Sequence, residues 1–154
     1  FERVRSVFER ARICRRLESG ELGADDANAA WRDLPALPDE QAKRLGARLE
    51  AAGETAGEDV LEGNRARADR AVLTMELVAG VDSPPDARGA RMELKVSRLN
   101  ESMRGEREAT DPEEEMDALL TNWAVTGPLD PDAAKSLEER AAKALEAFYG
   151  QSLD

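Results

Sequence analysis

The 154-residue sequence predicts an all-α fold, either an antiparallel multi-helix bundle or a short helical-repeat array, with about six to seven helices and no sheet. Apolar residues recur at spacings of three and four in every periodic segment, which places them on one face of a helix. The apolar residues are mostly Ala, Leu and Val among abundant Glu and Arg, a mixture typical of helices. No alternating run of β-branched and aromatic residues indicates a strand, so we expect at least about 65% helix.

The first predicted helix spans residues 1–19 and has one apolar side, which consists of Val4, Val7, Phe8, Ala11 and Cys14. Gly20 interrupts this helix. A short second helix carries Trp31, and Asp25 or Asp26 is expected to cap its N-terminus by accepting a backbone hydrogen bond.

Two prolines separate the second helix from the third. Pro35 and Pro38 cannot continue a helix from within, and Pro38 is suited to begin the next one, in which Leu45 and Leu49 face inward. Residues 53–63 hold three glycines without a dense apolar pattern, so they are predicted to form a loop or frayed turn, and the fourth helix is expected to start between Glu58 and Arg67.

A corner between the fourth and fifth predicted helices is the motif around which the chain is organised. The fourth helix is expected to end at Gly80, which can adopt the left-handed conformation. Ser83 is expected to cap the fifth helix, with Pro84 in its first turn and Asp86 at the acidic position of a capping box. The fifth helix, residues 84–104, has a 4-3-4 apolar seam that is predicted to pack on another helix: Met92, Val96, Leu99 and Met103.

Two Asp-Pro pairs begin the last two predicted helices. Asp111 caps the sixth, which carries Trp123 and runs to Gly127–Pro128, and Trp123 is expected to be buried. Asp130 caps the seventh, which ends near Gly150 and has an inward side made of Leu137, Ala141, Leu145 and Phe148.

The predicted helices group into two units that form one continuous domain. Residues 1–56 make a first unit with the Trp31 corner, and residues 57–154 make a second with the hairpin at 75–103 and the Trp123 corner. Both tryptophans precede a Leu- and Pro-containing corner by the same spacing, which indicates an internal repeat. Chance similarity between Ala-rich helices is the other explanation.

The amino-acid composition excludes most of the common catalytic and metal-binding sites. The chain has no histidine and one cysteine, Cys14, which excludes a Ser-His or Cys-His nucleophile and a His-bearing zinc site. The apolar neighbours of Cys14 favour a small buried hydrophobe, although nearby arginines could instead activate its thiol. There is no glycine-rich phosphate loop, and the acidic clusters lie at predicted helix starts, where capping explains them. We therefore expect no enzyme, no catalytic residue, no cofactor and no metal site.

The basic residues are concentrated in two segments of an acidic chain. The net charge is −11, which disfavours bulk attraction to nucleic acid or to an anionic membrane. The segment 1–19 nevertheless has six arginines against three glutamates, and a basic stripe runs beside the apolar seam of the fifth helix. The candidate docking face comprises Arg88, Arg91, Lys95 and Arg98 of this stripe together with Arg5, Arg12 and Arg16. These side chains either pair with acidic neighbours inside the fold or bind a polyanion, an RNA or an acidic protein.

Several of these segments resemble a bacterial family of long, charged, helical proteins known as domain of unknown function 349. The resemblance rests on Trp-Ala-Val-Thr-Gly-Pro-Leu at 123–129, Trp-Arg-Asp-Leu-Pro at 31–35, and the corner at 75–84 with the following Arg91-Met92 and Arg98-Leu99. The copy at Trp31 departs from the pattern in having Leu-Pro in place of Gly-Pro. The resemblance implies the C-terminal portion of a larger, all-helical bacterial protein inside the cell, without an assigned activity.

The sequence thus leads to two expectations about function. The first is a non-enzymatic interaction or scaffold module of a larger bacterial cytoplasmic protein, with protein partners and no membrane or small-molecule substrate. The alternative is a regulatory factor associated with nucleic acid or the ribosome through the Arg-rich helices. Because the chain begins with Phe1, we expect a fragment or a processed product.

Overall fold

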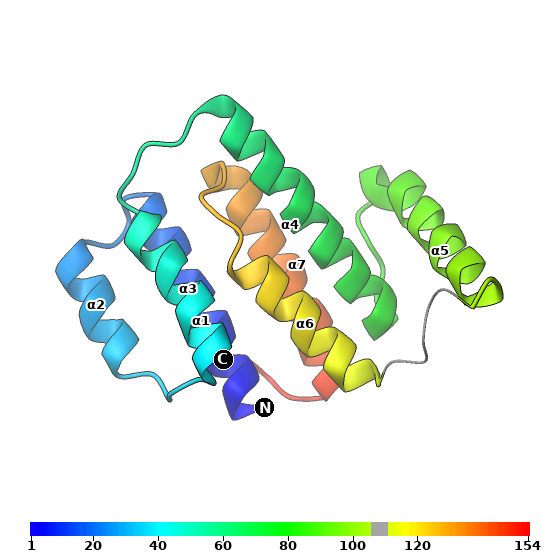
Figure 1. Ribbon diagram of the computed structural model, residues 1–154, viewed down its shortest axis with the longest axis horizontal. Helices are drawn as coiled ribbons and strands as arrows, with labels where there is room; N and C mark the ends of the chain where they lie inside the picture. Colours follow the sequence, from blue (N-terminus) through cyan, green and yellow to red (C-terminus); the bar gives the residue numbers. More distant parts are fainter. Residues whose placement is uncertain (106–110) are drawn as a thin grey trace.

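Seven α-helices and one short 3₁₀ helix account for the secondary structure of a computed structural model that describes residues 1–105 and 111–154 (Figure 1). About 75% is helical, above the expected fraction, and the all-α prediction is confirmed. The elements are α1 (Glu2–Glu18), α2 (Ala24–Arg32), α3 (Asp39–Ala51), α4 (Glu58–Ala79), η1 (Pro85–Ala87), α5 (Arg88–Met103), α6 (Pro112–Ala124) and α7 (Pro131–Tyr149).

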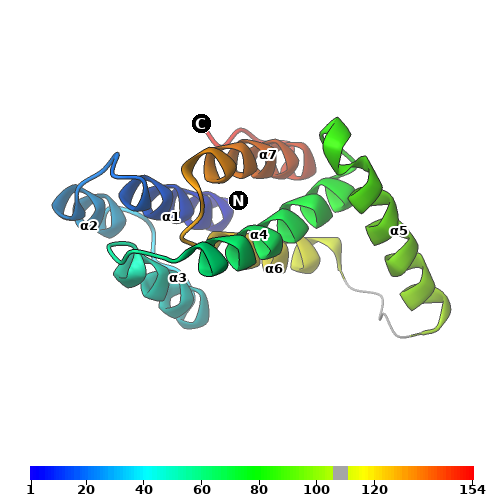
Figure 2. The same ribbon diagram turned by 90° about the horizontal axis from the view of Figure 1, so that it is seen from above.

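The long helix α4 lies at the centre of the arrangement and packs against α6 and α7 (Figure 1). On the other side of α6 and α7 lies α1, which α2 and α3 cover, while α5 stands at the far end of the molecule (Figure 2). One apolar cluster runs through the bundle and draws buried residues from α1, α3, α4, α6 and α7. Alanines such as Ala68, Ala124, Ala141 and Ala144 are fully buried in it, so the helices can approach one another closely.

The ends of the later helices follow the predicted signals. The side chain of Asp111 accepts a hydrogen bond from the Glu113 amide (3.2 Å), and that of Asp130 accepts one from the Ala133 amide (3.3 Å). Gly80 ends α4 in the left-handed conformation with φ 72°, and the Val81 amide then donates to the Glu76 carbonyl (3.1 Å). These predictions are confirmed.

Two predicted caps are wrong. Gly23 is the N-cap residue of α2, and Asp25 and Asp26 lie inside its first turn, where their charges favour the helix dipole without capping it. Ser83 does not cap the next helix, because its hydroxyl donates to the buried Glu76 carboxylate instead. The sixth helix also ends at Ala124, three residues before the Gly127–Pro128 pair, whose peptide bond is cis.

The core is organised around an aromatic pair that joins α1 to α6. The rings of Phe8 and Trp123 stack with centroids 5.5 Å apart and an interplanar angle of 26°. Trp123 is 4% exposed, so its predicted burial is confirmed. Trp31 is only partly buried, and the guanidinium of Arg10 lies over its ring at 4.8 Å from the centroid. Trp31 therefore lies at the edge of the core, and Trp123 lies within the core.

An ion pair buried beneath the Gly127–Pro128 turn links three helices. Arg48 of α3 donates from Nε and Nη2 to the Glu18 carboxylate of α1 (3.0 and 2.8 Å), and from Nη1 to the Ala124 carbonyl at the end of α6 (2.7 Å). Both side chains are nearly inaccessible to solvent. A Cβ at Gly127 would lie 2.3 Å from Arg48 Nε, so the turn can close over the guanidinium only because this residue is glycine.

We expect Trp123→Ala to lower the free energy of unfolding by about 3–5 kcal/mol, because it empties an aromatic site in the core and removes the ring stacked on Phe8. Urea denaturation measures this change. The matched control is Trp31→Ala, which should cost clearly less because its ring is already partly in water. Equal losses for the two variants would contradict the packing described here.

Gly127→Ala should destabilise the protein by about 1–3 kcal/mol, since the new methyl group must displace a guanidinium held by a buried carboxylate. Gly46→Ala is the control, because a Cβ there meets nothing within 4 Å. This change in the middle of α3 should stabilise by about 0.5–1 kcal/mol. Thermal melting of both variants tests the pair, and a neutral Gly127→Ala variant would show that Arg48 is not fixed in place.

Candidate functional site

Helix α5 differs from the other helices of similar length in how little of it is buried. Leu94 is its one buried residue, and it lies in a groove between α5, α4 and α7. The helix stands away from the bundle and joins it through the corner after α4 (Figure 2). An isolated 16-residue helix has marginal stability in water. Helix α5 is largely exposed, so much of its apolar surface is not buried by the rest of the fold.

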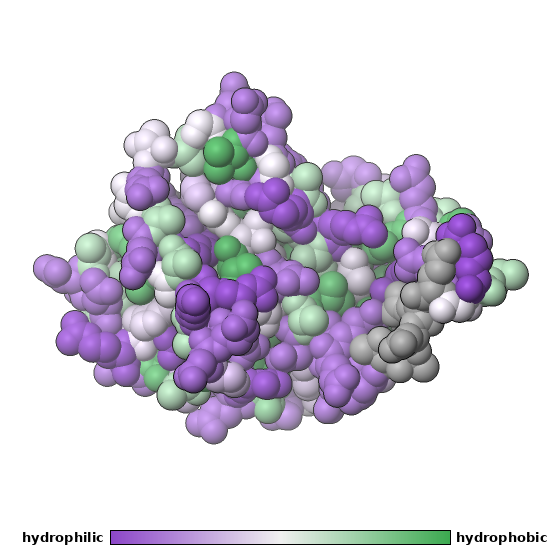
Figure 3. All heavy atoms as spheres, in the orientation of Figure 1, coloured by the Kyte–Doolittle hydropathy of each residue, from purple (hydrophilic) through white to green (hydrophobic). Residues whose placement is uncertain are grey.

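The apolar stripe of α5 faces solvent. The exposed fractions are 62% for Met92, 48% for Val96, 60% for Leu99 and 78% for Met103. The prediction that this seam packs on another helix is therefore wrong for the described residues. Leu94 follows Met92 by two positions, about 200° around the helix, so contact through Leu94 turns the stripe outward. Figure 3 shows apolar surface on the part of the molecule that α5 forms.

A buried carboxylate fixes the corner from which α5 begins. Glu76 is 2% exposed and accepts hydrogen bonds from Arg140 Nη2 (2.6 Å) and Nε (3.0 Å) of α7. The hydroxyl of Ser83 donates to the same carboxylate (2.9 Å). The hydrogen bond to Glu76 raises the pKa of Arg140 above its ordinary value, so this guanidinium stays charged. We call Glu76, Ser83, Arg91 and Arg140 the corner network.

Arg91 extends the corner network onto α5. Its Nη1 donates to Ser83 Oγ (2.8 Å) and to the Val81 carbonyl oxygen. These bonds connect the first turns of α5 to the end of α4 and set the direction in which the helix leaves the bundle. The sequence signal for this network was weak, because Glu76 is one acid among many in the chain, although it lies between the apolar residues Met75 and Leu77.

The predicted basic stripe divides into two pairs. Arg91 belongs to the corner network, and Arg98 donates to both carboxylate oxygens of Glu115 on α6 (3.0 and 3.2 Å). Arg88 and Lys95 are exposed, and no acceptor for either side chain is found in residues 1–105 and 111–154. Arg88 and Lys95 therefore supply the free positive charge beside the apolar stripe.

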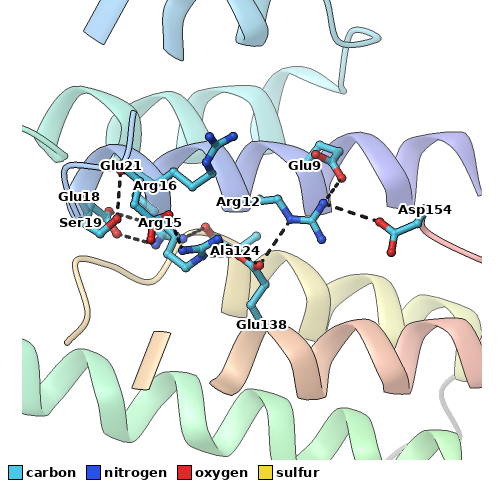
Figure 4. Close-up of polar contacts among 11 residues, drawn as sticks. Glu9, Arg12, Arg15, Arg16, Glu18, Ser19, Glu21, Ala124, Glu138 and Asp154 are labelled. Atoms are coloured by element: carbon cyan, nitrogen blue, oxygen red, sulfur yellow. Dashed lines mark hydrogen bonds and ion pairs between the residues drawn. The ribbon is translucent and has the colours of Figure 1, made fainter. Parts of the chain in front are cut away.

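The structure does not bring the predicted basic residues of α1 next to those of α5, because α4, α6 and α7 lie between these helices (Figure 1). Arg12 donates to Glu9 (2.9 Å) and Glu138 (3.4 Å) (Figure 4). Arg5 donates to the Ser152 carbonyl oxygen (2.9 Å). The guanidinium of Arg16 points away from these ion pairs in Figure 4.

The single thiol is shielded from reaction. Cys14 is fully buried, and burial raises its pKa to about 11, which opposes formation of the nucleophilic thiolate. Among the described residues, no three His, Cys, Asp or Glu side chains gather as metal ligands. Over the same part of the chain, none of the helices has the length and apolar character needed to cross a bilayer.

Two surface grooves accompany these features. The larger, about 850 Å³, lies between α4, α5 and α7, and its lining mixes Arg and Asp or Glu side chains with Leu73, Leu94 and Leu137. The smaller, about 480 Å³, lies between α3, α4 and α6 and is lined by Arg44, Arg67 and Arg70 without an Asp or Glu among its described residues. Neither groove was predicted, because each joins residues that lie far apart in the sequence.

Comparisons with known proteins do not add a functional assignment. No family model matches the chain, and no curated protein and no solved structure matches it.

Reversing the charges of the two pairs on α5 should separate their roles. Arg91→Glu with Arg98→Glu places acids beside Glu76 and Glu115, and we expect the free energy of unfolding to fall by on the order of 1–3 kcal/mol. Arg88→Glu with Lys95→Glu alters exposed side chains and should change it by less than about 0.5 kcal/mol. Thermal melting compares the two variants. If both melt alike, Arg91 and Arg98 do not hold α5 in place.

Proposed function

We propose that this chain is a non-enzymatic interaction module of a larger bacterial cytoplasmic protein, and that it binds an amphipathic helix of a partner protein on the outer face of α5. The observation that carries the proposal is the apolar stripe of Met92, Val96, Leu99 and Met103, which is arranged as a helix-packing seam and is exposed. A contiguous apolar surface of this kind is typical of an interaction site.

Charge beside the stripe supports a partner helix of particular chemistry. Arg88 and Lys95 lie on one flank, three residues before Arg91 and Arg98 respectively, and the other flank carries Glu93 and Asn100. A helix laid on the stripe would therefore gain from apolar residues at positions three and four apart and from acids on the side that meets Arg88 and Lys95. An acidic, amphipathic partner helix would thus contact the apolar stripe and the basic flank of α5 at the same time.

A second copy of the chain is a weaker occupant for the same face. Stable protein interfaces bury about 800 Å² on each partner, and four side chains on one short helix supply only part of that area. In a parallel pair Arg88 would meet Glu93 of the second copy, but in an antiparallel pair Lys95 would oppose Lys95. A larger partner that also reaches past α5 is the better fit.

The resemblance in the corner at 75–84 and in the Gly127–Pro128 turn supports the bacterial and cytoplasmic parts of the proposal. Nucleic acid or ribosome association remains the second candidate, and the exposed Arg88 and Lys95 favour it. Two separated exposed cations give little electrostatic affinity for a polyanion, because affinity grows with each phosphate neutralised. The protein partner is for that reason the first candidate.

The test is co-purification of the full-length protein from its native cells with Val96→Glu and Leu99→Glu introduced together. Both side chains are exposed, so melting should be nearly unchanged, within about 0.5 kcal/mol per site. We expect a partner protein to be lost from this variant. In a separate protein without these two substitutions, a photoreactive residue at position 99 should crosslink to that partner. Val60→Glu is the control, since Val60 is another exposed apolar residue and lies at the start of α4.

The outcomes separate the candidates. Loss of the partner with Val96→Glu and Leu99→Glu, and its retention with Val60→Glu, supports the proposal. A partner that disappears after nuclease treatment or steeply with salt supports the nucleic-acid alternative instead. A crosslink only to the chain itself, with a dimer in sedimentation, would assign the stripe to self-association and overturn the partner-helix proposal.

A further inference from the structure

We propose that the cleft between α3, α4 and α6 binds a small molecule that carries a phosphate or pyrophosphate group. This inference is independent of the function proposed for α5. It rests on three exposed arginines that line one cleft of about 480 Å³, whose described lining contains no Asp or Glu. We call Arg44, Arg67 and Arg70 the arginine triad.

The triad is assembled from two helices. Arg67 and Arg70 stand three residues apart on α4, so they share one side of that helix, and Arg44 reaches the cleft from α3. Like charges on neighbouring helix positions repel each other. An anion that entered the hollow would relieve the mutual repulsion of these three side chains.

Several other arginines have a carboxylate partner, although Arg10 and Arg91 donate to neutral oxygens. Arg48, Arg98 and Arg140 each meet a carboxylate, which cancels their charge. In the cleft the acceptors are neutral amides. Arg44 donates to the Asn122 side-chain oxygen (3.4 Å), and Arg67 donates to that of Asn64. A neutral acceptor positions a guanidinium but leaves its charge and its other N–H donors free for a ligand.

Asn64 is the residue that holds this arrangement. It is buried, and its Nδ2 donates to the Pro128 carbonyl oxygen (2.8 Å) in the turn after α6. Arg67 is thereby fixed to the same turn that closes over Arg48. No acceptor for the side chain of Arg70 is found in the described part of the chain, and Arg70 lines both this cleft and the groove between α4, α5 and α7.

The remaining lining suits the uncharged part of a ligand. Thr74 and Thr126 donate their hydroxyl hydrogens to the carbonyls of Arg70 (2.7 Å) and Asn122 (2.6 Å), so their oxygens remain as acceptors for ligand hydroxyl groups. Ala71, Leu119 and Val125 supply apolar surface. The volume lies within the range of about 300–1,000 Å³ that is usual for small-molecule sites.

Phosphate is the chemistry that best matches the triad. Guanidinium groups present paired N–H donors that bind two phosphate oxygens at once, and three of them match a group with two or more negative charges. The helices α3, α4 and α6 lie nearest the viewer in Figure 1, and the three arginines of the cleft are exposed, so a ligand can enter from solvent.

Calorimetric titration with pyrophosphate, and separately with inorganic phosphate, tests the inference on the full chain in a chloride buffer of moderate ionic strength. We expect saturable binding of pyrophosphate and a rise in the melting temperature. Arg44→Gln with Arg67→Gln should weaken the affinity at least about tenfold, because each removes a charge-assisted contact. Arg65→Gln is the control, since Arg65 is an exposed arginine of α4 that pairs with Asp69 and lines the other groove.

Amide chemical shifts identify where the probe binds. Pyrophosphate should shift the signals of residues around Asn64, Asn122 and Gly127 and leave those of α5 unchanged, which keeps this result separate from the partner-helix test. The inference is overturned if the wild-type chain shows no saturable binding, if Arg65→Gln weakens binding as much as the double variant, or if the shifts lie elsewhere. If the double variant melts far below the wild type, Arg70→Gln, which breaks no described side-chain bond, takes its place.

Discussion

The buried carboxylate of Glu76 is the constraint on which the shape of the molecule depends. A charge removed from water must be matched by donors in good geometry, and here α7 supplies Arg140 and the following corner supplies Ser83. Satisfying Glu76 therefore fixes how α4 lies against α7 and how the chain turns after Gly80. Arg91 of α5 donates to the same serine. The position of Glu76 therefore also determines that α5 leaves the bundle rather than folding onto the bundle.

An alanine-rich interior explains why such charged contacts are needed. Small side chains allow close helix packing but specify little about register, since many alignments of Ala and Leu faces bury similar area. The bonds from Arg48 to Glu18 and to the Ala124 carbonyl admit one alignment of α1, α3 and α6. Arg15, Arg12 and Glu138 fix α1 against α7 in the same way (Figure 4). We infer that the polar contacts select the arrangement and the apolar cluster supplies most of its stability.

Local signals in the sequence predicted the helices, most of their ends and the inward side of α1, because capping, proline and periodicity act within a few residues. The burial of Trp123 was predictable for the same reason. The outward stripe of α5 was not, since periodicity identifies an apolar face without saying whether the fold covers it. Arg48 with Glu18, and the arginine triad, join residues on separate helices, and composition gives no sign of such pairings. The sequence indicated α5 as a candidate docking region, but it could not distinguish Arg91 and Arg98, which have partners within the fold, from Arg88 and Lys95, which are exposed.

The placement of the two tryptophans makes the protein its own optical reporter. Trp123 is enclosed against Phe8, whereas Trp31 is partly open to water beneath a guanidinium, so the two indoles experience different surroundings. Their emission should therefore differ in wavelength and in quenching by solutes such as iodide or acrylamide. Since α5 contains no aromatic residue, an event confined to its outer face would be silent in this signal, and a change in emission would report a rearrangement of the bundle itself.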